Sequence, residues 1–146
     1  MDRFDLARKV ARLAASLDSR VTTLEAVPDS VAGVYTPTRS AEVNLDANVT
    51  TFECQYAQTG NTVVVSGRFT ADPTLAATQT SFELTLPVAS NLGAVGDLAG
   101  TAFCGNIAGM GAEILGSIAN NTAVVSWVSS DITAQTWGFV FAYQVI

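Results

Sequence analysis

The stretch 136-TWGFVFAYQVI-146 decides the fold class of this chain. Because side chains alternate between the two faces of a strand, one face of this segment would be apolar throughout: Trp137, Phe139, Phe141, Tyr143 and Val145. The other face would also be largely apolar: Gly138, Val140, Ala142, Gln144 and Ile146. A strand that is apolar on both faces belongs at the centre of a sheet or beneath an interface. We therefore expect the carboxyl end of the chain to be part of a sheet.

Similar signals recur along the rest of the chain. Runs rich in Val, Phe, Thr and Trp, with turn residues between them, occupy residues 51–56, 61–70, 80–86, 101–104 and 122–129. Thr59-Gly60-Asn61 predicts a hairpin turn between the first two runs. Seven of the 11 glycines gather between Gly93 and Gly116, which predicts a long loop or short interrupted strands there and the most variable or binding surface of the molecule.

These signals predict a mainly β protein. The expected architecture is an antiparallel β-sandwich, jelly-roll-like, over residues 49–146, and a composition of 49% hydrophobic and 14% charged residues agrees with a folded domain. Residues 28–48 are expected to form a linker or an edge strand, because Pro37 cannot donate to a central ladder.

The first 27 residues differ from everything that follows, because they carry a heptad stripe. Its positions are Leu6, Val10, Leu13, Leu17, Arg20, Leu24 and Val27, and only Arg20 is polar. Pro28 would end this helix, since the residue before a proline is driven out of the α region. An amphipathic helix cannot leave its apolar stripe in water, so we expect a coiled coil of several copies. The alternative is a helix packed along its own β domain.

The heptads leave two questions open. Mixed Val and Leu at the a positions do not decide between a dimer and a trimer. Arg20 in the stripe could fix the register, bind an anion or carboxylate on the symmetry axis, or simply be tolerated.

Charge is distributed unevenly. The helical segment holds five basic and four acidic residues, whereas from Asp29 onward only Arg39 and Arg68 oppose nine carboxylates. This balance argues against nucleic acid as a partner, since phosphates attract clustered Lys and Arg. So few charges on a domain surface indicate either coverage by neighbouring molecules or a surface rich in Thr, Ser and Asn.

The chain lacks the residue types that most common catalytic sites require. The chain has no histidine, so Ser-His-Asp and Cys-His sites and His-ligated zinc are excluded, and Lys9, the sole lysine, cannot form a GxxxxGK loop. Neither a cofactor nor a metal is expected. Carboxylates for a glycosidase exist, but spacing singles out none of them: Glu42, Asp46, Glu53, Asp72, Glu83, Asp97, Glu113 and Asp131.

Three smaller features have competing interpretations. Asn44 to Asn48 resembles the start of a calcium loop but lacks its glycine, and we prefer an alternating segment with Val43, Leu45, Ala47 and Val49 inward. Trp127 and Trp137 could stack on sugars, but alternation favours the core. Cys54 and Cys104 are expected to be buried free thiols, although sequence cannot exclude their pairing.

No secretory signal or membrane-spanning run is evident, so we expect no membrane insertion and synthesis in the cytosol. An organelle presequence is disfavoured by Asp2, Asp5 and Asp18, because such segments avoid acidic residues.

Several stretches resemble a recurrent class of tailed-bacteriophage virion proteins, fibre-like or capsid-decorating, in which a short helix precedes a compact β domain. The matching stretches are 33-GVYTPT-38, 55–67 from Gln55-Tyr56 through GNTVVVSG, 72-DPT-74, 84-LTLPVAS-90 and 139-FVFAY-143. They are strand and turn patterns spread across most of residues 33–143, not catalytic signatures.

The resemblance implies a non-enzymatic viral structural protein: a trimer in the virion, assembled in the host cytoplasm. Its partners would be other virion proteins, such as the major capsid or tail proteins, with the host surface as a further candidate. Because this chain has no fibre shaft, a capsid decoration (cement) protein or short appendage is favoured over a free-standing tail fibre. The alternative is a receptor-binding module that recognises a host glycan or protein through residues 93–116 and 131–136.

Overall fold

A computed structural model describes residues 5–6, 8–16, 30–46 and 49–146 of the chain. Residues 5–6 and 8–16 are helical, and nearly all other regular structure is β. The predicted mainly β, antiparallel fold with a helix near the amino end is confirmed in this form, with one short helix.

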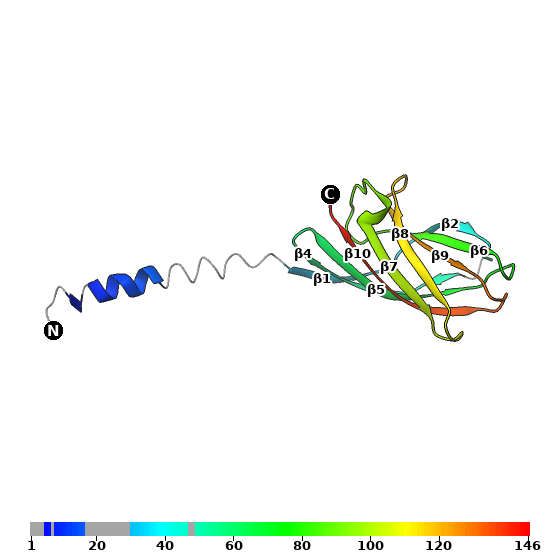
Figure 1. The fold of residues 1–146 in the computed structure, drawn as a ribbon, viewed down its shortest axis with the longest axis horizontal. Coiled ribbons are helices and arrows are strands. Elements are labelled where there is room, and N and C mark those ends of the chain that lie inside the picture. The colour runs from blue at the N-terminus through cyan, green and yellow to red at the C-terminus, as the bar shows by residue number, and fades with distance from the viewer. Residues whose placement is uncertain (1–4, 7, 17–29, 47–48) are drawn as a thin grey trace.

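Ten strands and one short 3-10 helix follow the helical residues. Their bounds are β1 Ser30–Tyr35, β2 Arg39–Val43, β3 Thr50–Thr51, β4 Cys54–Thr59, β5 Thr62–Ala71, β6 Gln79–Leu84, η1 Val95–Asp97, β7 Leu98–Cys104, β8 Gly111–Ser117, β9 Thr122–Val128 and β10 Gln135–Gln144. Figure 1 shows these strands curling around a shared interior.

The strands form one antiparallel sheet with hydrogen-bonded order β1-β4-β5-β10-β7-β8-β9-β6-β2, and β3 pairs with β5 outside this path. The two ends of the sheet, β1 and β2, are consecutive in the chain. Hydrogen bonding runs without a break from one end to the other, so the strands form one sheet, which curls (Figure 1), and a sandwich of two separate sheets is not confirmed.

Strand β10 lies inside the sheet, fourth in this order, and so has a neighbour on each side, as its sequence predicts. It pairs with β5 from Gln135↔Ala71 to Gln144↔Thr62, and with β7 on its other side. Its side chains alternate strictly between buried and exposed. The buried face belongs to the core that the curl encloses, whose largest fully buried members include Trp137, Phe69, Phe82, Phe141, Leu84 and Leu98.

The hairpin between β4 and β5 also forms as expected. Thr59 and Thr62 are cross-strand partners, so Gly60 and Asn61 make a two-residue turn. Gly60 has φ +58°, a left-handed conformation that glycine adopts without steric cost and that matches the twist of a tight hairpin.

Of the two expectations for the glycine-rich segment 93–116, a long loop or short interrupted strands, the structure shows the second, because it contains β7 and nearly all of β8 with residues 105–110 between them. Gly100 sits inside β7, where a Cβ would come within 2.4 Å of the Val140 carbonyl oxygen and of Phe141 Cβ. Gly116 in β8 is similarly close to Leu92, at 3.0 Å. These glycines mark close approach of packed segments rather than turns, and sequence spacing alone does not distinguish the two uses.

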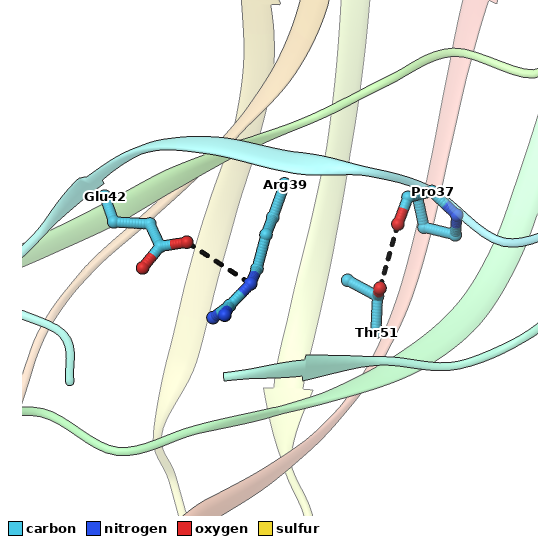
Figure 2. A network of polar contacts seen from close by, with 4 residues as sticks. All are labelled: Pro37, Arg39, Glu42 and Thr51. Carbon is cyan, nitrogen blue, oxygen red and sulfur yellow. Dashed lines mark hydrogen bonds and ion pairs between the residues drawn. The ribbon is translucent and has the colours of Figure 1, made fainter. Parts of the chain in front are cut away.

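Residues 30–46 supply both ends of the sheet. The short connection between β1 and β2 is held to β3, because Thr51 Oγ1 donates to the Pro37 carbonyl oxygen at 2.8 Å (Figure 2). Arg39 and Glu42 form an ion pair along β2 at 3.3 Å, also drawn in Figure 2. Such half-exposed pairs contribute little stability.

The expected alternation from Val43 to Val49 is wrong at its first position. Val49 is buried and Leu45 packs on the core, but Val43 is 52% exposed, and Ala47 lies outside the described residues. The alternation breaks at Asn44, which has φ 57° and so turns the chain. Its amide donates to the Leu75 carbonyl oxygen and to Thr80 Oγ1, which anchors this turn inside the fold.

Candidate functional site

The helix presents an apolar stripe that the rest of the described chain leaves uncovered. Leu6, Val10 and Leu13 follow one another at spacings of four and three residues, so they share one helical face. Their exposed fractions are 54%, 61% and 67%. Burying three such side chains would be favourable by about 1.5 to 3 kcal/mol each, which makes this face a candidate contact surface.

The remaining predicted oligomerisation residues cannot be placed. Leu17, Arg20, Leu24 and Val27 lie outside the described residues. The stripe as a whole, and the coiled coil it would form, therefore stay predictions.

The two tryptophans belong to the core, as alternation predicts. Trp127 is 4% and Trp137 0% exposed, and their ring centroids lie 5.1 Å apart. Neither indole face is open to a ligand, so the idea that these rings stack on sugars is wrong. Aromatic recognition of a host glycan would need other residues.

Two of the candidate carboxylates accept hydrogen bonds within their own turns. Asp97 accepts hydrogen bonds from the backbone N–H groups of Gly93 and Ala94, both at 2.8 Å, and so closes the turn before β7. Asp131 accepts from the backbone N–H and hydroxyl of Thr133, and these bonds hold the pKa of Asp131 below its ordinary value. Both carboxylates stabilise turns.

Glu83 is the most enclosed acidic residue of the described chain, at 8% exposure. Its carboxylate accepts two bonds from the Asn120 amide, at 2.9 and 3.1 Å, and one from Thr122 Oγ1 at 2.8 Å. Two neutral side chains satisfy this carboxylate with three hydrogen bonds, and they join β6 to the turn before β9 and to the first residue of β9. The arrangement is that of a structural anchor.

Residues 5–6, 8–16, 30–46 and 49–146 contain no group of three or more His, Cys, Asp or Glu side chains that could hold a metal ion. The two cysteines are free thiols. Cys54 is buried, as expected, and burial raises the pKa of its thiol, whereas Cys104 is only half-buried.

Outside the helix, the described surface is notable for shallow grooves on the outer side of the sheet. One groove of about 480 Å³ lies over β1, β4 and β5, and its lining is uncharged: Ala32, Gly33, Val34, Gln55, Tyr56, Ala57, Val64 and Ser66. A second lies beside it over β5 and β10, with Glu53 and Arg68 at its margin. A third, near Asn120 and Asn121, is lined mainly by small polar side chains.

Comparison with known proteins assigns no family to this arrangement, because no protein-family model, no curated protein and no solved structure matches the chain. Among the described residues, no helix has both the length and the apolar character needed to cross a membrane.

Proposed function

We propose that this chain is a non-enzymatic structural protein that works as a homo-oligomer, with the amino-terminal helix as its assembly element. The observation that carries the proposal is the uncovered stripe of Leu6, Val10 and Leu13. In the assembled protein, several such helices would pack their stripes together as a coiled coil, and each copy would display its β domain.

The finer form of the proposal follows the sequence resemblance. We place the assembly in a bacteriophage virion, as a trimeric capsid decoration protein or short appendage with a jelly-roll-like domain facing outward. Its mechanism would be burial of apolar surface, at about 25 cal/mol per Å², offset by the cost of association. The engagement of Glu83, Asp97 and Asp131 in structural hydrogen bonds fits a protein without a catalytic task.

The alternative, a receptor-binding module, has less support. Its aromatic candidates are buried, and much of residues 93–116 is paired strand. A host-binding surface on this chain would have to use the remaining loops.

The test is the oligomeric state of the full chain and of two helix variants, measured by light scattering coupled to size exclusion at micromolar concentrations. Leu13→Asp with Leu17→Asp places carboxylates in the stripe and is expected to give monomers whose β domain stays folded. Ala15→Asp lies on the opposite helical face and is the matched control, expected to assemble normally. A wild-type chain that is monomeric, or a double variant that assembles like wild type, would overturn the proposal.

A further inference from the structure

The outer face of the sheet, which points away from the core, carries an unbroken row of apolar side chains. Consecutive members are cross-strand partners on seven neighbouring strands, and we call them the apolar row: Ala32, Ala57, Val64, Ala142, Ala99, Leu115 and Val124. With neighbouring strands about 4.8 Å apart, the row is about 29 Å long. Its first five members are exposed and the last two are half-buried.

The surroundings of the row are nearly free of charge. Strands β1, β4, β5, β10 and β7 contain a single charged residue, Arg68. On these five strands the residues beside the row are uncharged: Val34 (57% exposed) and Val140 (43% exposed) are apolar, and Gln55, Ser66 and Gln144 are polar. A monomer surface rarely has so large a face without charge, and charge depletion is typical of the centre of an interface.

The distribution of charge favours another copy of this chain as the partner over a charged molecule. The chain carries a net charge of −6, so two copies repel each other wherever their carboxylates meet. The acidic side chains of the paired strands lie beyond the five strands named above, on β2, β6 and β8. The part of this face on β1, β4, β5, β10 and β7 is therefore where copies can approach without repulsion between carboxylates, and it offers no complement to a charged partner.

We propose that the apolar row and its exposed flanking residues pack against a second copy of this chain. The inference rests on the proposed homo-oligomer and adds a contact surface in the β domain. Small residues such as Ala57 and Ala142 let another backbone approach closely. The groove over β1, β4 and β5 provides space for side chains that project from the other copy.

The area of this face is smaller than that of a stable protein interface. Five strands spaced by about 4.8 Å, with six to ten residues each at about 3.3 Å per residue, cover about 600 Å² per copy. A stable interface of standard size buries about 800 Å² per partner. The face alone therefore makes a weak contact, which the helices complete in the assembled protein.

The test compares two Val→Lys substitutions in the full chain by sedimentation equilibrium across micromolar concentrations. Val64 is in the row and 44% exposed, and Val128 is on β9, outside the row and 59% exposed. Both lysines reach solvent in a free chain. Only Val64→Lys would bury an unpaired charge between copies, and it is expected to raise the dissociation constant at least about ten-fold, with Val128→Lys unchanged.

Ala142→Lys is a second variant of the row, used if Val64→Lys does not fold, and fluorescence of the buried Trp127 and Trp137 reports the fold of each protein. A wild-type chain that associates while the row variants associate equally well would overturn this contact and leave the helix-based oligomer standing. A wild-type chain that is monomeric throughout would overturn both.

Discussion

The ring of Trp137 on β10 stacks on the ring of Phe69 on β5, with centroids 5.8 Å apart and an interplanar angle of 13°. The same two residues are cross-strand partners, and neither is exposed. Aromatic partners on the buried face of a sheet oppose register slips, because a shift of one strand by one residue would turn its ring toward water and separate the pair. This pair therefore joins the strand that the sequence identifies as central to its longest neighbour.

Trp137→Ala is expected to lower the free energy of unfolding by about 3 to 5 kcal/mol, because it removes the largest fully buried side chain and leaves a cavity. Chemical denaturation followed by circular dichroism measures the change. Ile132→Ala, at a position that is 61% exposed, is the control and should shift the value by no more than about 0.5 kcal/mol. Similar losses for the two variants would contradict the assignment of Trp137 to the core.

Two glycines on paired strands should respond oppositely to alanine. Gly100→Ala places a Cβ within 2.4 Å of the Val140 carbonyl oxygen, and backbone must move, so we expect a loss of about 2 kcal/mol or more. Gly138→Ala meets nothing within 4 Å and should leave stability unchanged or raise it by up to about 1 kcal/mol. Thermal unfolding at low protein concentration measures the stability of the two variants relative to wild type. Equal effects would show that Gly100 is not closely packed.

Two tyrosines differ in how their hydroxyl groups are satisfied. The Tyr143 hydroxyl donates to the Val88 carbonyl oxygen at 2.7 Å and accepts from the Val88 N–H at 3.1 Å. The Tyr35 hydroxyl is buried without a hydrogen-bond partner. Tyr143→Phe should therefore cost about 1 to 2 kcal/mol, whereas Tyr35→Phe should be neutral or stabilising by up to about 1 kcal/mol. The midpoints of denaturant unfolding compare the stabilities of the two variants. A marked loss of stability in Tyr35→Phe would contradict the finding that the Tyr35 hydroxyl has no hydrogen-bond partner.

Stability should fall in alkaline solution. Burial raises the pKa values of Tyr35, Tyr143 and the Cys54 thiol, and the nearby Cys54 and Tyr143 raise that of Tyr35 further. These groups are neutral when protonated, so the folded chain holds its protons more tightly than the unfolded chain does. Their contribution is complete below the ordinary values of 9.0 for cysteine and 10.0 for tyrosine. It is lost as the pH rises above these values toward the folded pKa values.

Unfolding free energies measured from pH 7 to pH 11 would show this decline. Tyr35→Phe should reduce it, because the substitution removes one of the three titrating groups. A wild-type chain that is equally stable across this range would contradict the burial of these side chains.

The local sequence predicted the structure correctly where a pattern, such as side-chain alternation or a glycine between two strands, has only one structural explanation. The doubly apolar segment 136–146 predicted a central strand, and β10 has neighbours on both sides. Gly60 and Asn61 predicted a tight hairpin, and the alternation around Trp127 and Trp137 predicted burial. Each of these follows from side-chain alternation or from backbone freedom at one position.

The same reasoning did not decide the structure where a residue type serves two purposes. Gly100 and Gly116 left a long loop and short interrupted strands both open, because glycine serves both turns and close packing within strands, and Val43 fits an alternation that Asn44 interrupts. Glu83, which looked like one of eight interchangeable carboxylates, is distinguished only by its enclosure with Asn120 and Thr122. The sequence around Glu83 does not indicate these partners, because they lie 37 and 39 residues away along the chain.

The sequence by itself determined the β class of this protein, its central strand, its acidic balance and the helical stripe at its amino end, because these depend on the order and type of neighbouring residues. The tertiary structure alone decided that the outward side chains of seven strands line up as one apolar row. Members of that row come from residue 32 to residue 142, and only the strand order and register bring them side by side. Periodicity describes each strand, whereas a surface depends on how the strands are paired.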